Sequence, residues 1–367
     1  MQSMHDVTVL ELVNPTSPTH LRLASGMATK LLADLGVRVI RILPPGSDVL
    51  EDLEPLLPDG TSAVARFLNT SKLVLQTTSD EDRSQALERL LASGVSAIVM
   101  EEGEPLHPLL LATETPLIEI ATWPRGVVLE GSDSEFTVLA ASGLLDIIGD
   151  PTSSPLRLGG HQAAYAAGLS AFTATMIALA QADAGGEPSR ARISLVETAT
   201  WINWKAVAGV YNGDEMPTRP GELADFQVMR CSDGWFAFVF TPNEFDRVHA
   251  MFEGIDLSDL PIVDQPSLRA NIRVLTQRLS PWFAERARDD VFAIAQRNGI
   301  PAGPVYSPRD LLSDPQYEAR SFLVSLTDDS GSVIRMPRIP LSWNGVRFDP
   351  RDSQTVELDT LIDGVRR

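Results

Sequence analysis

Few side chains in this sequence are arranged for chemistry, and the densest group lies in residues 155–168, which read PLRLGGHQAAYAAG. His161, Gln162 and Tyr165 in this segment could form hydrogen bonds or move a proton. The other histidines are scattered and form no HExxH pattern, and the single cysteine, Cys231, excludes an intrachain disulfide. We therefore expect hydrogen bonding or proton transfer at this segment, and no structural metal.

The composition is that of a soluble globular protein, with 44% hydrophobic and 22% charged residues among 367. This length predicts two domains or one elaborate domain. The formal net charge of -19 excludes nucleic acid and anionic membranes as probable partners. The first residues, MQSMHDVTVLEL, do not read as a signal peptide, and no apolar run reaches the roughly 18 residues of a membrane span. A cytoplasmic location is expected.

The first hundred residues alternate between strand and helix patterns. Apolar, β-branched runs predict strands at 7–12, 37–43 and 95–100, and apolar residues at helical spacing predict helices at 21–35 and 80–92. Such alternation is typical of a parallel sheet covered by helices, here a Rossmann-like α/β layer. The loop after the first strand, NPTSPTH, lacks GxGxxG, so NAD binding is a poor hypothesis.

The pattern changes further along the chain. Residues 165–182 are small and apolar and predict a helix buried on most faces. Residues 211–225 have no hydrophobic period and are interpreted as a linker, which ends a large domain at 1–210. A strand hairpin turning at SDG opens a smaller α/β domain at 226–300, and a second hairpin is predicted within 301–367 across the turn at Asp329–Gly331.

Seven separated segments then converge on one family. Together, and in this order, they resemble the class III CoA-transferases, the CaiB/BaiF family, over nearly the whole chain. The last of them, NGIPAGPVYSPRDLLSDPQYEAR, is among the most recognisable stretches of that family. The segments are VLEL near the start, Lys30–Asp48, Leu68–Lys72, Ser134–Pro151, Pro155–Ala171, Arg230–Phe238 and Asn298–Arg320.

The resemblance implies a fold and an assembly. Members of the family are interlocked homodimers, in which two ring-like chains pass through each other. Each chain has a large Rossmann-like domain, made from the N-terminal half and the C-terminal segment, and linkers to a small domain. We therefore expect residues 301–367 to lead back to the large domain.

The resemblance also implies a chemistry. In active members an aspartate carboxylate attacks an acyl-CoA thioester, and the resulting anhydride is attacked by CoA thiolate. Acyl-CoA is then a substrate, and no tightly bound cofactor is needed. At the position of that aspartate, four residues before Gly168, this chain has Ala164. A methyl group cannot form an anhydride, and neither His161 nor Gln162 replaces a carboxylate in that role.

Other family motifs are altered as well. Leu43 stands where an acidic residue usually follows the second strand, MEEGEPL replaces the ENxxPG turn, and GGEPSRAR replaces RxxGxGQ. Several of these motifs belong to the CoA site of the family. Their joint loss fits a natural subunit that has diverged better than a point mutation in a standard enzyme.

The resemblance nominates five further site residues. Asn69 and Lys72 match the NxxK segment, whose lysine lies near the CoA phosphates, and Arg41 could face the nucleotide. A surface lysine and a solvent-facing arginine are the simpler readings. Glu135 matches a glutamate near the active site, as an acid, base or positioning group, or as a charge favoured at a helix N-terminus. His161 is a catalytic candidate or a structural hydrogen-bonding group.

Four functions remain open on the sequence. The chain is the non-catalytic partner of a related catalytic subunit, or an active homodimeric transferase whose aspartate was mutated to Ala164. A 2-methylacyl-CoA racemase is less favoured, because its His/Asp pair is lost here and residues 122–136 replace its histidine segment. A non-enzymatic CoA-binding role is the fourth.

Overall fold

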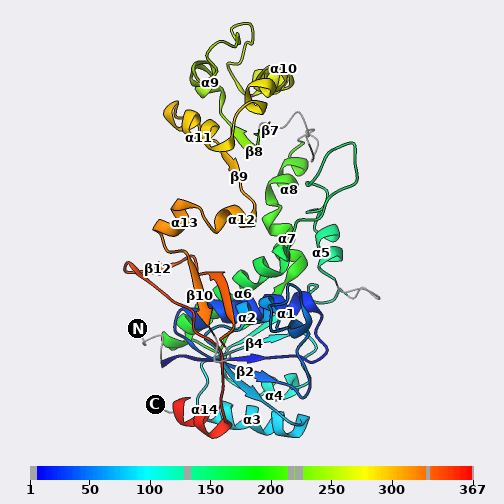
Figure 1. The fold of residues 1–367 in the computed structure, drawn as a ribbon. Helices are drawn as coiled ribbons and strands as arrows, with labels where there is room; N and C mark the ends of the chain where they lie inside the picture. The colour runs from blue at the N-terminus through cyan, green and yellow to red at the C-terminus, as the bar shows by residue number, and fades with distance from the viewer. Residues whose placement is uncertain (1–5, 128–133, 214–218, 220–225, 328–330, 366–367) are drawn as a thin grey trace. The chain divides into compact units, whose positions relative to one another are not determined.

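The chain divides into two compact units in this computed structural model, which describes residues 6–127, 134–213, 219, 226–327 and 331–365 (Figure 1). The first unit comprises Met1–Ile148, Leu156–Asp214 and Phe322–Arg367, and the second comprises Gly149–Pro155 and Glu215–Ser321. The small domain expected at 226–300 falls within the second unit, and most of the proposed linker at 211–225 lies outside the described residues.

A seven-stranded parallel sheet forms the centre of the first unit, in the order β14-β3-β2-β1-β4-β5-β6. The run 3-2-1-4-5-6 is the doubly wound arrangement, so the predicted Rossmann-like α/β layer is confirmed. The edge strand β14 comes from the C-terminal segment, which pairs with β3. The strands are β1 (Thr8–Leu12), β2 (Arg38–Leu43), β3 (Leu73–Gln76), β4 (Ala97–Glu101), β5 (Leu117–Ala121), β6 (Arg190–Ser194) and β14 (Gln354–Thr355).

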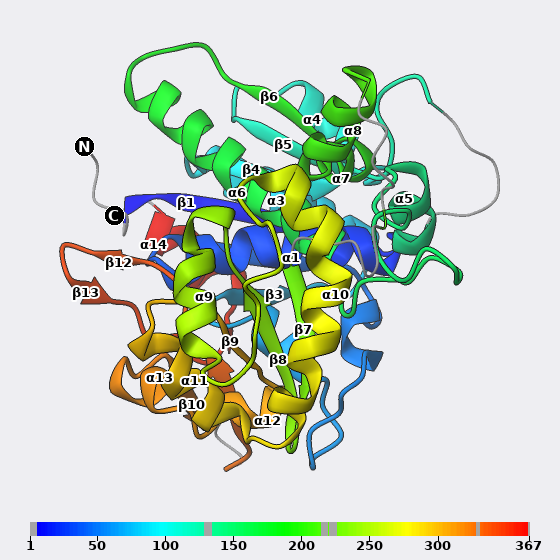
Figure 2. The same cartoon turned by 90° about the horizontal axis from the view of Figure 1, so that it is seen from above.

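Two layers of helices cover the sheet, because successive strand residues point to opposite faces. Val9, Val39 and Val99 pack with α1 and α6, whereas Leu10 and Ile40 pack with α3 and α14. Figure 2 shows α1 and α6 crossing the same face of the sheet. The helices of this unit are α1 (Thr19–Asp34), α2 (Ala63–Leu68), α3 (Asp80–Ala92), α4 (His107–Leu111), α5 (Glu135–Ala141), α6 (Gln162–Asp183), α7 (Leu195–Ile202), α8 (Trp204–Tyr211) and α14 (Leu358–Val365).

The long helix α6 has two different faces. Ala163, Ala167 and Ala171 are buried against the sheet and α1, whereas Leu169 and Ile177 are 54% and 61% exposed. The prediction that this helix is buried on most faces is therefore wrong for the chain taken alone. Among the described helices α6 is the one long and apolar enough for a membrane span, but its packing on the sheet is that of a core helix.

The second unit has its own core. β7 (Phe226–Cys231) and β8 (Gly234–Val239) form the predicted antiparallel hairpin, and β9 (Gly303–Val305) pairs with β8. Phe236, Phe238 and Phe283 pack beneath this sheet. Its helices are α9 (Phe245–Met251), α10 (Gln265–Ala284), α11 (Arg288–Arg297), α12 (Pro308–Leu311) and α13 (Pro315–Ala319).

Short strands in the C-terminal segment belong to the first unit. β10 (Leu323–Thr327) pairs antiparallel with β11 (Val333–Pro337), as the sequence predicts, and β12 (Ser342–Trp343) pairs with β13 (Val346–Arg347). The turn expected at Asp329–Gly331 lies largely outside the described residues. The chain then enters β14, so the C-terminal segment leads back to the large sheet.

Candidate functional site

The structure brings the three candidate catalytic positions together. Glu135 is the first residue of α5, where the hydroxyl of Ser134 caps the helix, and its side chain is only 6% exposed. The Nδ1 of His161 lies 2.8 Å from Glu135 Oε2 and donates to that carboxylate. The backbone N–H of Ala164 donates to Glu135 Oε1 at 3.1 Å. One buried carboxylate therefore connects the start of α5 to the start of α6.

Glu135 is held in its ionised form. Burial by itself raises the pKa of this carboxyl group, but the hydrogen bonds from His161 and from the Ala164 N–H outweigh burial and lower it. Arg157, 3.8 Å from Glu135 Oε2, adds to this effect. An ionised, fully engaged carboxylate acts by positioning its donors, and it is poorly suited to give up a proton.

Tyr165 completes the polar cluster. Its ring meets the imidazole of His161 edge to face, with 6.3 Å between the centroids. Burial and the negative charge of Glu135 raise the pKa of the phenol. The hydroxyl therefore stays protonated near neutral pH and is available as a hydrogen-bond donor.

Ala164 has an apolar environment. Its side chain is fully buried and belongs to a cluster with four buried apolar side chains from α1, α2 and the short helix Val49–Asp52. The methyl group thus fills a hydrophobic site directly beside the polar cluster. The four neighbours are Leu23, Leu50, Ala65 and Leu68.

The three residues expected at the CoA phosphates lie elsewhere, in a buried polar network. The Nζ of Lys72 is fully buried and donates to Glu11 Oε2 and Thr29 Oγ1, both at 2.8 Å. Arg41 pairs with Asp48, and Asn69 closes the end of α2. Among the described residues no contact joins these three to Glu135 or His161. The phosphate contact stays a prediction that this arrangement does not support.

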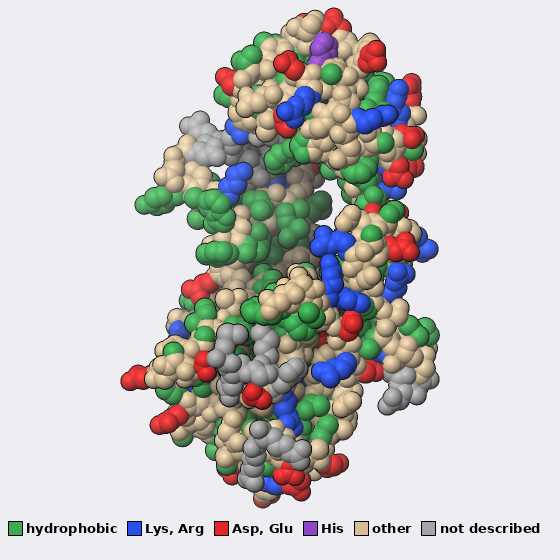
Figure 3. Space-filling view, turned by 90° about the vertical axis from the view of Figure 1, so that its left-hand side faces the viewer, with side chains coloured by type: hydrophobic (Ala, Val, Ile, Leu, Met, Phe, Trp, Pro, Cys, Tyr) green, Lys and Arg blue, Asp and Glu red, His purple; other side chains and the backbone are tan. Residues whose placement is uncertain are grey.

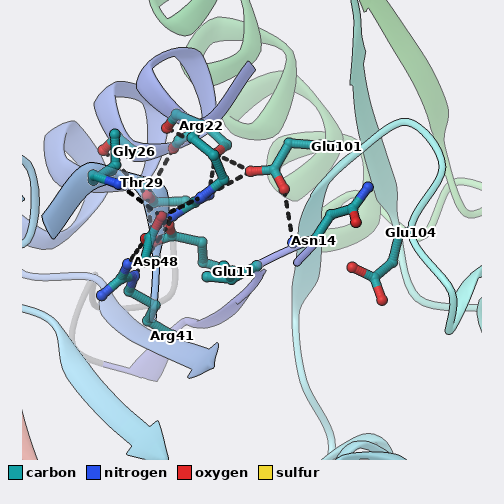
Figure 4. A network of polar contacts seen from close by, with 12 residues as sticks. Glu11, Asn14, Arg22, Gly26, Thr29, Arg41, Asp48, Glu101 and Glu104 are labelled. Carbon is teal, nitrogen blue, oxygen red and sulfur yellow. Dashed lines mark hydrogen bonds and ion pairs between the residues drawn. The ribbon is translucent and has the colours of Figure 1, made fainter. Parts of the chain in front are cut away.

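Arg22 is the centre of this network and was missed by sequence reasoning (Figure 4). Its guanidinium is 1% exposed, donates to Asp48 Oδ2 at 2.9 Å and to Glu101, and lies 3.3 Å from Glu11. A glutamate in the apolar run VLEL was the available signal, because a buried carboxylate needs a buried cation. The matching arginine could not be found, since helical spacing alone does not show which polar residue faces the sheet.

The charges in this network depend on one another. Burial opposes ionisation of Glu11, but Lys72, Arg22 and Arg41 lower the pKa of its carboxyl group. Burial lowers the pKa of Lys72 to about 8 despite the attraction of Glu11. The opposite charges offset the cost of burial for one another, and their contacts tie α1 to β1, β2 and β4.

The carboxyl ends of β1 and β4, where doubly wound proteins hold their ligands, are crossed by hydrogen bonds within the chain. Asn14 donates from its backbone to Glu101 Oε2 and from its side chain to the Glu102 carbonyl, both at 2.9 Å. Arg83 binds the Val13 carbonyl at 2.8 Å. Within the described ranges no group of three His, Cys, Asp or Glu side chains is arranged to hold a metal ion.

Known proteins resemble this chain over most of its length. A succinate–glutarate CoA-transferase of Agrobacterium fabrum is 22% identical over 346 residues, which cover 87% of this chain and 86% of that protein. The succinyl-CoA:(R)-benzylsuccinate CoA-transferase subunit BbsE of Thauera aromatica is 24% identical over 356 residues, covering 88% and 87%. The crystal structure of a CaiB/BaiF family protein from Brucella suis superposes with a TM-score of 0.80 at 20% identity, covering 99% and 98%.

A family model extends this likeness to a defined group. The model described as CoA-transferase family III matches residues 129–354, a segment that includes Glu135, His161 and Ala164. It covers more than half of the chain, and the fold agrees with that of the CaiB/BaiF protein. The resemblance seen in the sequence motifs is thereby confirmed, and this chain belongs to CoA-transferase family III.

Proposed function

We propose that this chain serves CoA transfer between an acyl-CoA and an organic acid as the subunit that lacks the nucleophile and pairs with a related catalytic chain. The observation that carries the proposal is the environment of Ala164. In the reaction the partner's carboxylate attacks the thioester, which forms a mixed anhydride and releases CoA thiolate. The thiolate attacks the anhydride, which forms an enzyme-bound CoA thioester and releases the donor acid, and the acceptor acid then takes up CoA by the reverse steps. The present chain is the second, non-catalytic subunit of the assembly.

An aspartate would fit poorly at position 164. Its carboxylate would enter the apolar cluster of Leu23, Leu50 and Leu68, where it would lose hydration. It would also lie next to the ionised Glu135, which already accepts the Ala164 N–H. Surroundings that suit a methyl group support a natural alanine over an engineered one.

Glu135 and His161 have a positioning role in this proposal. Their hydrogen bond fixes the ring orientation of His161, which is about one-third exposed, while the carboxylate itself is buried. The exposed part of the imidazole can meet an acyl group or a carbonyl oxygen brought by the partner chain. The pair therefore shapes the acyl end of a shared cleft.

CoA itself is assigned mainly to the catalytic partner. Lys72 and Arg41 are engaged in buried ion pairs, and Asn69 is 6% exposed. We assign all three a structural role. Acyl-CoA remains the substrate of the assembly, with no tightly bound cofactor.

A large apolar surface supports association with another chain. Trp201, Trp204, Val210 and Tyr211, on α7 and α8, are 74%, 64%, 65% and 89% exposed. Figure 3 shows hydrophobic side chains gathered on the surface of one face. Monomeric proteins rarely expose apolar residues in such groups, so a partner is expected to cover them. A relative named as a subunit, BbsE, favours a related chain as that partner. A cytoplasmic location is part of this proposal.

The test is co-expression with a related family member encoded beside this chain. Native mass spectrometry should show a complex containing both chains. CoA transfer should require both, and succinyl-CoA is the first donor to assay because several relatives are named for it. Transfer by this chain alone would contradict the proposal. Activity gained by Ala164→Asp in the isolated chain would favour the homodimeric enzyme instead.

A further inference from the structure

A cavity of about 270 Å³ lies at the amino ends of β2 and β3. It is distinct from the cluster around Glu135: Leu50, which packs on Ala164, follows the carboxyl end of β2, whereas the cavity lies where the chain enters that strand. The C-terminal segment forms one wall, beside the edge strand β14. Its polar lining consists of Arg38, Ser71, Lys72, Arg351, Asp352 and Gln354.

Arg38 is a partly buried cation with no counter-ion among the residues that the structure describes. Its Nη2 donates to the Leu361 carbonyl of α14 at 3.0 Å, which leaves Nη1 without a hydrogen bond to any described residue. Within the described ranges no carboxylate pairs with it. Burial lowers the pKa of this guanidinium, with no acidic group acting against it. Burying an uncompensated charge is costly, and a bound anion would offset that cost.

Arg351 is fixed by its backbone and free at its side chain. Its N–H donates to Ser71 Oγ at 3.0 Å, and its carbonyl accepts from the Ser71 N–H at 2.8 Å. The guanidinium has no hydrogen bond or ion pair to any residue that the structure describes. The backbone of this second arginine is therefore fixed at the cavity, while its exposed guanidinium is unengaged within the described ranges.

The remaining charges of the lining are already matched. Asp352 lies 3.7 Å from Arg66, and the Lys72 ammonium is taken up by Glu11. The excess positive charge of the cavity thus comes from Arg38 and Arg351, in a chain whose formal net charge is -19. Two neighbouring guanidinium groups without matching carboxylates, in so acidic a chain, favour a site for an anion.

We propose that this cavity binds a small oxyanion, a phosphate group or a carboxylate, between Arg38 and Arg351. Guanidinium groups present paired N–H donors that suit both kinds of oxyanion. Such a ligand would join β2 to the segment leading into β14. It would thereby stabilise the return of the C-terminal segment to the sheet, because a ligand that binds the folded state alone raises its stability.

The experiment is calorimetric titration of the full chain with inorganic phosphate and with succinate, each at constant ionic strength maintained with sodium chloride. Arg351→Gln is the main variant, because the exposed guanidinium forms no hydrogen bond or ion pair with a described residue. Arg38→Lys is the second, since it keeps the charge but loses the paired donors. Arg125→Gln, an exposed arginine of the same unit outside the cavity lining, is the matched control.

We expect saturable binding of at least one probe, weakened by at least about tenfold in Arg351→Gln and unchanged in Arg125→Gln. Binding of phosphate alone would identify a phosphate-bearing ligand, and binding of succinate alone would identify a carboxylate. The proposal is overturned if neither probe binds beyond the effect of chloride. Equal affinity of wild type and Arg351→Gln would also overturn it.

Discussion

The carboxylate of Glu135, at the start of α5, accepts two hydrogen bonds from the start of α6. The donors are the imidazole of His161 and the backbone N–H of Ala164. Because these bonds need the ionised form, they lower the pKa of Glu135 below its usual value of 4.5. The consequence is a stability that depends on pH.

Glu135→Gln should reduce that dependence. The folded pKa lies below the unfolded one, so the carboxylate stabilises the folded chain above about pH 4.5, and this contribution disappears as the pH falls through the lowered pKa. We expect Glu135→Gln to lower the free energy of unfolding at pH 7 by about 1–3 kcal/mol and to converge with wild type in acid. Urea unfolding between pH 3 and pH 7, about the range over which a glutamate titrates, measures this.

Glu197→Gln is the control for this series. Glu197 also lies in the first turn of a helix, α7, but its side chain is exposed. This variant should follow the wild-type curve within about 0.5 kcal/mol at every pH. Parallel curves for wild type and Glu135→Gln would show that the carboxylate is not held as described.

Ala164→Asp should destabilise the chain without making it active. The new carboxylate would lie in the apolar cluster, beside Glu135, and we expect a loss of about 2–4 kcal/mol at pH 7. Part of this loss should be recovered at low pH, when the new group is protonated. Ala164→Asn, uncharged and similar in size, should cost less. Wild-type stability of Ala164→Asp would mean that position 164 still accommodates a nucleophile.

At the scale of elements, α1 is connected to the sheet by charge as well as by apolar packing. Arg22 and Thr29 on this helix meet Glu11 of β1, and Lys72, just before β3, reaches the same carboxylate. Groups buried this deeply have no water to replace a lost partner. Removing one charge therefore affects several elements together.

Lys72→Met should destabilise the fold by about 3–5 kcal/mol, because it leaves Glu11 with reduced compensation. The double variant Lys72→Met with Glu11→Gln should recover part of the loss, since both sides of the pair are then neutral. Chemical unfolding of the single variants and the double variant gives the coupling free energy. If Lys72→Met unfolds like wild type, Lys72 is not a structural residue, and a role at the CoA phosphates becomes the better interpretation.

The surface of α8 presents the opposite case, since none of its residues is buried by the part of the chain that the structure describes. Trp204→Glu together with Tyr211→Glu should change the stability of the isolated chain by less than about 1 kcal/mol, because both side chains are exposed. The same change should weaken association with a second chain at least about tenfold. Sedimentation velocity measures the association, and Lys205→Glu, exposed on the same helix, is the control. Unchanged association would place the interface elsewhere.

At the scale of the whole molecule, each of the two units has a hydrophobic core of its own. Phe283 of α10 is fully buried among Phe236, Phe238 and Phe252. Phe283→Ala should destabilise the second unit by about 3–5 kcal/mol. Hydrogen exchange should quicken in β7, β8 and α10 while β1 and β2 keep wild-type protection.

The reciprocal change is Leu12→Ala in β1, which lies in the core of the first unit. It should quicken exchange in the large sheet and leave the amides of β7 and β8 unchanged. If either substitution accelerates exchange uniformly over the whole chain, the two units unfold as one cooperative body.

Local sequence patterns were sufficient for much of the backbone. The strands at 7–12 and 37–43, the helix at 80–92 and the hairpin opening at Phe226 were predicted to within a few residues. Gly36 directly follows the predicted helix at 21–35, and its φ of 94° is one that glycine adopts without strain. Burial alternates along each element with a fixed period, so neighbouring residues contain the information needed.

Motif matches predicted some residues of the candidate site correctly and misplaced others. Motif order pointed to Glu135, His161 and Ala164, and these three meet in space. The same reasoning placed Lys72 near a ligand, whereas it lies in a buried network around Arg22. A motif records which residue types accompany one another, but it does not record which way a side chain points in a diverged chain.

Sequence motifs and periodicity were enough to identify the family, several strands and helices, and the absence of an aspartate at position 164. Only the folded chain shows that Ala164 is enclosed by apolar side chains, that α6 and α8 keep exposed apolar faces, and that the returning C-terminal segment pairs with β3 as the edge strand β14. The reason is physical. Periodicity depends on residues a few positions apart, whereas burial and charge pairing depend on residues that only the folded chain brings into contact.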